Sequence, residues 1–279
     1  MKTTISILGC GWLGTALGYK LLKNDYIVKG STKSYDKHIR LETSGIQTYF
    51  LTVTKDDLKV DYGNFFNTDV LVITLPPARI DDIEDVFPQQ IQHIIDYVTS
   101  LKIKKVLFIS STSVYESTNS IVREGDEGNT DKASGKALLK AEKLLQNIKD
   151  VDCTVLRFGG LIGGKRNPAS FLKGKSDVAS TIPINLIHLD DCVDIILQII
   201  KKDAWGETYN ACSPGHPTKL EFYTLAAEIS DVPPPKFVHK SQDFKIVNSD
   251  KLIQDLDYKF IYHSPIDYLK SLEEWSYNI

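Results

Sequence analysis

The chain begins with apolar runs on either side of a glycine-rich turn. Residues 4–8 (TISIL) are typical of a short buried strand. Residues 9–14 (GCGWLG) follow with GxGxxG spacing, and residues 26–28 (YIV) begin a second strand. Between them, apolar side chains recur every fourth residue along one face of a helix: Leu13, Leu17 and Leu21. The pattern predicts a strand–helix–strand unit.

The alternation of strands and helices continues through the first half of the chain. The apolar run at 70–74 is typical of a parallel strand buried on both faces, another buried strand is expected at 105–110, and a further strand is expected at 154–156. Helices are expected at 83–101 and 136–148. Repeated βα units of this kind predict an α/β fold with a Rossmann-type, doubly wound parallel sheet.

Beyond residue 157 the pattern is less regular. Asp190 is expected to cap a helix, and Thr218 with Glu221 forms a capping-box pattern that opens another. The last expected helix carries a row of apolar residues: Leu269, Leu272 and Trp275. We therefore expect a dinucleotide-binding core at 1–157 and a small C-terminal substrate-binding lid at 158–279, with some segments returning to the sheet.

Each glycine of the first turn has a physical task in a dinucleotide site. Gly9 allows the tight turn, Gly11 leaves main-chain N–H groups accessible to a diphosphate, and Gly14 lets the helix pack closely. The flanking strand and helix support this interpretation; the alternative is a glycine-rich turn in another α/β fold. The expected cofactor contacts lie in this turn and at two later strand ends: Gly9, Cys10, Gly11, Trp12, Leu13, Gly14, Ser31, Thr32, Lys33, Leu75 and Pro76.

The end of the second strand favours NADP over NAD. An NAD site usually places a carboxylate about 20 residues beyond the glycines, to bind the ribose 2′-hydroxyl. Residues 29–34 (KGSTKS) contain no acid. Lys33 can neutralise a 2′-phosphate, Ser31 or Thr32 can donate to it, and Arg40 can add charge. The alternative is an ordinary polar loop.

Composition indicates a small-molecule partner. The chain has 33 Lys and Arg against 36 Asp and Glu, a formal net charge of −3, which gives no basic field for nucleic acid. Its 4 cysteines are scattered without metal-ligand spacing, so we expect reduced thiols and no metal site. No stretch reaches the roughly 18–20 apolar residues of a membrane span. We expect a cytoplasmic monomer or homodimer.

Several motifs in order resemble the extended short-chain dehydrogenase/reductase superfamily, the NAD-dependent epimerases and dehydratases. They are the glycine turn at 9–14, SSTSVY at 110–115, LRFGGLIG at 156–163 and IHLDD at 187–191. The resemblance covers nearly the whole chain. It implies a Rossmann core, a nicotinamide cofactor and oxidoreductase-type chemistry.

The catalytic YxxxK motif of that superfamily is missing. Aligned on Glu142, the tyrosine position holds Ser134 and the lysine position holds Leu138. A phenol serves as an acid or base near neutral pH only when positive charge stabilises its phenolate, and a serine hydroxyl without a base does not replace it. The stretches at 135–142 and 184–191 are similar to the atypical YeeZ-like subgroup, which lacks the tyrosine.

Four side chains remain as candidates for chemistry. The resemblance implies that Ser111 hydrogen-bonds a substrate oxygen; the alternative is a serine that ends a strand. Tyr115 is a candidate proton donor and His188 a candidate acid or base, although packing and capping roles explain both. Arg79, just past a strand end, is a candidate contact for an anionic substrate; a surface arginine is the alternative.

Three functions are compatible with these residues. The first is an NADP- or NAD-dependent, epimerase/dehydratase-like oxidoreductase that acts on a small molecule with a non-standard acid–base apparatus. The second is a non-catalytic NADP(H)-binding sensor or regulatory protein. The third is a nucleotide-sugar epimerase or dehydratase, which the missing tyrosine disfavours.

Overall fold

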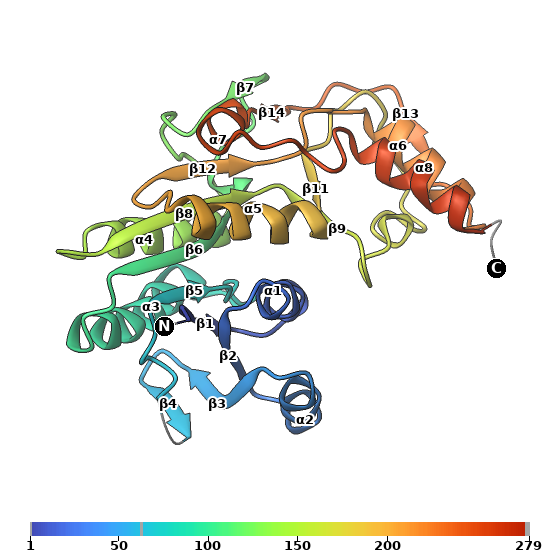
Figure 1. Cartoon of the computed structure of the whole chain (residues 1–279). Helices are drawn as coiled ribbons and strands as arrows, with labels where there is room; N and C mark the ends of the chain where they lie inside the picture. The colour runs from blue at the N-terminus through green and yellow to red at the C-terminus, as the bar shows by residue number, and fades with distance from the viewer. Residues whose placement is uncertain (1, 62–63, 277–279) are drawn as a thin grey trace. The chain divides into compact units, whose positions relative to one another are not determined.

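The central sheet reverses its strand order at β1, the first strand of the chain. The computed structural model describes residues 2–61 and 64–276. In this described part, eight strands form one sheet in the order β12-β8-β6-β5-β1-β2-β3-β4 (Figure 1). β1 pairs in parallel with β2 on one side and with β5 on the other. Such a reversal is the point at which doubly wound folds bind ligands, outside the carboxyl ends of the strands.

The sheet and the helices connected to it follow the expected alternation. The pairs β2–β3 and β5–β6 are also parallel, whereas β4 runs antiparallel to β3 at the edge. The elements in chain order are β1 (Thr4–Leu8), α1 (Trp12–Leu22), β2 (Ile27–Thr32), α2 (Tyr35–Thr43), β3 (Gln47–Val53), β4 (Leu58–Asp61), β5 (Val70–Ile73), α3 (Ile83–Ser100), β6 (Lys105–Ser111), α4 (Ala133–Gln146), β8 (Asp152–Phe158), α5 (Leu189–Lys202) and β12 (Thr208–Ala211). The Rossmann-type, doubly wound α/β fold is confirmed.

The remaining elements are short strand pairs and helices. The parallel pairs are β7 with β14, β9 with β11, and β10 with β13. Their bounds are β7 (Ser120–Val122), β9 (Gly160–Ile162), β10 (Val178–Ala179), β11 (Leu186–His188), α6 (Lys219–Ile229), β13 (Phe237–Val238), β14 (Lys245–Val247), α7 (Asp250–Leu256) and α8 (Pro265–Ser276). Two 3₁₀ turns lie at Thr112–Val114 and Pro168–Ser170.

The chain forms two compact units. The first consists of Met1–Tyr115, Gly128–Arg157 and Val193–Tyr209, and the second of Glu116–Glu127, Phe158–Cys192 and Asn210–Ile279. Residue 157, the expected boundary, is thus one of several points at which the chain passes from one unit to the other.

Each unit has an apolar interior that follows from its sequence pattern. In the first unit, β1, β5 and β6 are buried along almost their whole length, as their apolar runs require. In the second unit, α6 and α8 pack apolar faces together, with Phe222 and Leu269 almost fully buried. The capping box of α6 is present, since Thr218 accepts from the Glu221 N–H and Glu221 accepts from the Thr218 N–H.

Helix starts are the least accurate part of the sequence-based prediction. α4 begins at Ala133, three residues before the expected 136, and α5 begins at Leu189, so Asp190 lies in its first turn instead of capping it. The side chain that accepts from this turn is His188, whose Nδ1 receives the N–H of Asp190 at 3.2 Å. The expectation that Asp190 caps α5 was therefore wrong.

Candidate functional site

The glycine turn connects β1 to α1 in a conformation that depends on its glycines. Gly9 has φ +107°, a left-handed conformation that other residues rarely adopt. A Cβ on Gly14 would lie 2.4 Å from the carbonyl oxygen of Gly9, so any side chain there would push α1 away from the turn. α1 begins at Trp12, and Gly11, the residue before it, carries no side chain to cover the amides of its first turn.

The end of β2 is tied to this turn by two hydrogen bonds. The Gly9 N–H donates to the Ser31 hydroxyl oxygen at 2.8 Å, and the Cys10 N–H donates to the Ser31 carbonyl at 2.8 Å. Ser31 and Thr32 are both buried. The Thr32 hydroxyl oxygen accepts from the Ser34 N–H, which leaves the hydroxyl hydrogens of both residues to donate to a ligand.

A cavity of about 320 Å³ opens beside the turn; we term it the turn cavity. Its lining residues are Leu8, Gly9, Cys10, Gly11, Ser31, Thr32, Lys33, Lys37, Leu51, Val53, Leu75, Pro76, Ala78 and Gln90. A Cβ added to Gly11 would meet only the Gly9 carbonyl, at 4.0 Å, so the space next to that residue is open. The lining contains two lysines and no carboxylate. The structure thus brings together eight of the expected cofactor contacts.

The other three expected contacts lie on the first turn of α1, outside this lining. Leu13 and Gly14 are buried, and Trp12 is half-buried. Their main-chain groups belong to the start of α1, where the backbone and the helix dipole favour an anion.

Lys37 is the cavity residue that the sequence analysis missed. It lies on the first turn of α2, where the side chain of the preceding cap, Ser34, accepts its N–H. The cap explains why Lys37 lies on this first turn, but only the fold brings its charge to the turn cavity. Arg40, which was expected to add charge, donates from Nε to the Asp36 carbonyl and does not line the cavity.

Cys10 carries a thiol, the one potential nucleophile among the three residues of the turn before α1, but its environment makes it unreactive. Its side chain is 2% exposed. Burial raises the pKa of its thiol to about 12, and the positive charge of Lys37 opposes this only in part. The thiol stays protonated at neutral pH, so the structure assigns Cys10 a packing role beside the cavity.

A second cavity, of about 610 Å³, lies where β5, β6 and α4 present their ends; we term it the serine cavity. Its lining residues are Pro77, Ala78, Arg79, Ile80, Asp81, Ile83, Ser111, Ser113, Ala133, Ser134 and Leu138. The fold therefore brings two predicted residues, Ser111 and Arg79, to one cavity. Ser134 and Leu138, the two α4 residues that the sequence analysis aligned with the YxxxK motif, also line this cavity. Ala78 lines both cavities.

Ser111 ends β6 with its hydroxyl partly engaged. Its Oγ accepts from the Ser113 N–H at 3.1 Å, which caps the short 3₁₀ turn that follows. An oxygen that accepts one hydrogen bond still carries its own hydrogen. Ser111 thus combines the strand-ending role with the capacity to donate one hydrogen bond into the serine cavity.

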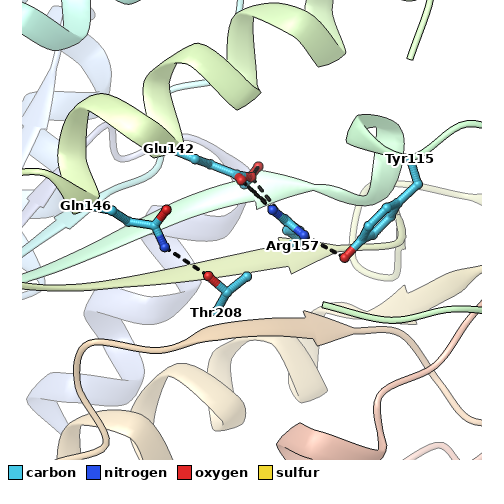
Figure 2. A network of polar contacts seen from close by, with 6 residues as sticks. Tyr115, Glu142, Gln146, Arg157 and Thr208 are labelled. Carbon is cyan, nitrogen blue, oxygen red and sulfur yellow. Dashed lines mark hydrogen bonds and ion pairs between the residues drawn. The ribbon is translucent and has the colours of Figure 1, made fainter. Parts of the chain in front are cut away.

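Tyr115 belongs to a buried network instead of the cavity wall. Figure 2 shows Arg157 between Glu142 and Tyr115: its Nη2 donates to Glu142 at 2.7 Å and its Nη1 donates to the Tyr115 hydroxyl at 2.6 Å. The Ser110 hydroxyl donates to the same carboxylate at 2.5 Å. Tyr115 is 3% exposed. Its phenol packs over a guanidinium and does not line the serine cavity, which favours the packing role.

His188 is likewise enclosed. It packs against the rings of Tyr262 and Tyr268, with centroids 4.6 and 4.3 Å away, and a Cβ on Gly163 would come within 2.1 Å of its Nε2. Burial lowers its pKa, and the nearby Asp190 opposes that shift. A neutral imidazole suits its observed role, since Nδ1 accepts the Asp190 N–H.

The described residues add three further facts. No cluster of three or more His, Cys, Asp or Glu side chains among them is arranged to hold a metal ion. None of the described helices is both long and apolar enough to cross a membrane. All 4 cysteines are buried free thiols.

Comparison with known proteins identifies relatives over almost the whole chain. No family model matches the sequence. Protein YeeZ of Escherichia coli, from strains K12 and O157:H7, is 30% identical over 266 residues, which cover 94% of this chain and 97% of YeeZ.

Two solved structures show the same fold at low sequence identity. An ADP-L-glycero-D-manno-heptose-6-epimerase of Helicobacter pylori superposes with a TM-score of 0.76 at 15% identity, over 98% of this chain and 96% of its own. The protein MoeE5, described in complex with UDP-glucose and NAD, superposes with a TM-score of 0.79 at 15% identity, over 99% of both chains.

Proposed function

Since this chain belongs to the family of Escherichia coli YeeZ, within the fold of the NAD-dependent epimerases and dehydratases, we propose that it binds a nicotinamide dinucleotide in the turn cavity. The observation that carries the proposal is the open space beside Gly11. That space lies at the N-terminus of α1 and at the strand-order reversal next to β1. A diphosphate there accepts from main-chain N–H groups and benefits from the positive end of the helix dipole.

The rest of the turn cavity suits the adenosine half of the cofactor. Apolar side chains from β3 and from the segment after β5 supply a surface for a flat base: Leu51, Val53, Leu75 and Pro76. Ser31 and Thr32 lie at the end of β2, where the ribose of a bound dinucleotide is held in this fold.

Within this function, we propose a preference for NADP over NAD. Among the described residues that line the turn cavity, the charged ones are Lys33 and Lys37. Two ammonium groups attract a 2′-phosphate, and no lining carboxylate is placed to accept from a free 2′-hydroxyl. MoeE5, by contrast, is described with NAD.

A thermal-shift titration with NADPH, NADH, NADP and NAD tests both statements. Stabilisation by a ligand grows as RT ln(1 + [L]/Kd), about 2.7 kcal/mol at a hundredfold excess over Kd. We expect all four ligands to raise the melting temperature and the phosphorylated pair to raise it more. No shift with any of them would refute the cofactor site, and equal shifts would refute the preference.

Matched variants localise the effect. Gly11→Val places a branched side chain in the phosphate space and is expected to abolish the shift. Gly125→Val is the control, because Gly125 is exposed and a Cβ there meets nothing within 4 Å. Replacing Lys33 and Lys37 by Gln is expected to weaken NADPH binding about tenfold or more while sparing NADH, since hydrogen bonds to charged groups contribute roughly 1.5–3 kcal/mol. The exposed Lys143→Gln serves as the charge control.

For chemistry, we propose an epimerase/dehydratase-like oxidoreductase that transfers a hydride between the cofactor and a small substrate in the serine cavity. Ser111 donates a hydrogen bond to the reacting oxygen. In the reducing direction, the carbonyl carbon receives the hydride and its oxygen takes a proton from solvent. NADPH turnover should then be detectable with aldehydes, ketones or nucleotide sugars, and Ser111→Ala should reduce it. Turnover unaffected by that variant would disprove the role of Ser111.

A second function has one observation in its favour. The helix face that would carry a catalytic phenol and ammonium presents Ser134 and Leu138 to the cavity instead. This suits a protein that binds NADP(H) without turnover and reports the cofactor ratio. Tight binding of NADPH with no turnover across the whole substrate panel would favour this function over the oxidoreductase.

A further inference from the structure

The serine cavity contains hydrogen-bond donors that the rest of the described chain leaves unused. Among the described residues, no hydrogen bond or ion pair engages the guanidinium of Arg79 or the hydroxyls of Ser113 and Ser134. Ser111 adds a fourth donor, since its Oγ accepts only the Ser113 N–H. A cavity with donors from four side chains is complementary to a ligand rich in acceptor oxygens.

The charges of the lining point to an anion. Among the described lining residues, Arg79 is the one cation and Asp81 the one carboxylate, and no ion pair joins them. An unpaired guanidinium presents a planar fork that matches the two oxygens of a carboxylate or phosphate. The remaining lining is apolar and comes from Pro77, Ala78, Ile80, Ile83, Ala133 and Leu138. It suits a short carbon skeleton.

We propose that the serine cavity binds a small anionic carbonyl or hydroxy compound, carrying a carboxylate or a phosphate, and that Arg79 selects its charge. Ser113 and Ser134 bond the remaining oxygens of the anion or of the carbon skeleton. This assignment rests on the proposed function, because it names the substrate class for the hydride transfer. Arg79 is a specificity residue in this scheme, and Ser134 is a binding residue in the lining of the same cavity.

Calorimetric titration of the protein saturated with NADP tests the assignment without requiring turnover. The probes are two pairs, each an anion and a neutral counterpart: pyruvate against its methyl ester, and glyceraldehyde 3-phosphate against glyceraldehyde. We expect the charged member of at least one pair to bind about tenfold or more tightly than its neutral partner, as a charge-assisted hydrogen-bond pair implies. The pair that shows the difference identifies the anion as carboxylate or phosphate.

Two variants distinguish a direct contact between Arg79 and the anion from the effect of removing any positive charge. Arg79→Gln should remove the difference within the pair, while NADP binding is unchanged. Lys136→Gln removes a charge from the exposed side of α4, where Lys136 pairs with Glu84 at 3.8 Å, and should retain the difference. Equal binding of charged and neutral probes, no binding of any probe, or equal losses in both variants would each overturn the assignment.

Failure of the cofactor proposal can be distinguished from failure of the anion assignment. If NADP itself produces no binding heat, the cofactor proposal is refuted. The same probe pairs titrated into unloaded wild-type protein and Arg79→Gln then still decide whether Arg79 binds the anion.

Discussion

Replacing Arg157 by Met should expose how strongly the first unit depends on one buried ion pair. The side chains of Arg157 and Glu142 are 9% and 3% exposed. Arg157 contacts the carboxylate through Nη2 at 2.7 Å and through Nε at 3.2 and 3.3 Å (Figure 2). Met fills part of the volume but donates nothing, so Glu142 keeps only the Ser110 hydroxyl as a partner from this network.

The expected loss follows from that uncompensated charge. Breaking a buried pair by removing one partner costs about 3–5 kcal/mol of unfolding free energy. A typical domain has roughly 5–15 kcal/mol in total, so the variant should unfold at a clearly lower urea concentration. The double variant Glu142→Leu/Arg157→Met removes both charges, and its loss should be smaller than that of Arg157→Met alone.

Urea unfolding followed by circular dichroism measures these differences. Lys140→Met is the control, because Lys140 pairs with Asp85 at 3.6 Å across side chains that are 49% and 78% exposed. Exposed pairs contribute about 0–1 kcal/mol. Two results would refute the argument that the uncompensated buried charge dominates. One is a loss of unfolding free energy below about 1 kcal/mol for Arg157→Met, and the other is a double variant at least as unstable as Arg157→Met alone.

Three further predictions concern other buried or capping groups. Tyr115→Phe removes the hydroxyl that accepts from Arg157 Nη1 and should cost about 1–3 kcal/mol in urea unfolding while NADPH binding persists; loss of NADPH binding would contradict the packing role. Thr218→Ala removes the α6 cap and should cost about 1 kcal/mol, whereas the exposed Thr224→Ala should be nearly neutral, and equal losses would contradict the capping box. Burial raises the pKa of Asp191 to about 6 from 3.8, so the folded state holds this proton more tightly than the unfolded chain. Its contribution to stability is complete below about pH 4 and is lost as the pH rises through about 6, a change of about 3 kcal/mol in the free energy of unfolding. Asp191→Asn should remove this pH dependence from the urea midpoints. An unchanged pH profile in that variant would contradict the shift.

The dinucleotide-binding unit could be predicted because its signals are local. The GxGxxG spacing, the apolar strand before it and the leucine row after it all lie within β1 and α1. Each signal limits the backbone independently: the positive φ of Gly9 and the close approach at Gly14 are properties that glycine alone tolerates well. Agreement among them made the turn identifiable without a structure.

Residues whose roles depend on distant partners were harder to assign. His188 had the chemistry of an acid or base in the sequence, but β11 pairs with β9 and places its ring against Gly163, while Tyr262 and Tyr268 enclose it. These partners are separated from it by up to 80 residues, so no local pattern contains them. Lys37 was missed because a lysine on a polar helix is expected to be a solvated surface residue. Only the fold shows that it lies in the lining of the turn cavity.

One helix, α4, contributes residues both to the serine cavity and to the buried network of Arg157. Ser134, Leu138 and Glu142 follow one another at intervals of four residues, a spacing that turns by about 40° per step along a helix. The first two therefore line the serine cavity, and the third enters the buried network with Arg157. Ser134 is half-buried, so a change there removes little buried contact, whereas Leu138 is 3% exposed and also packs in the core. A change at Glu142 would remove the carboxylate that pairs with the buried guanidinium of Arg157, which lowers stability. Glu142 and Arg157 therefore stabilise the fold, and the chemistry proposed for this protein depends on the residues that face the serine cavity.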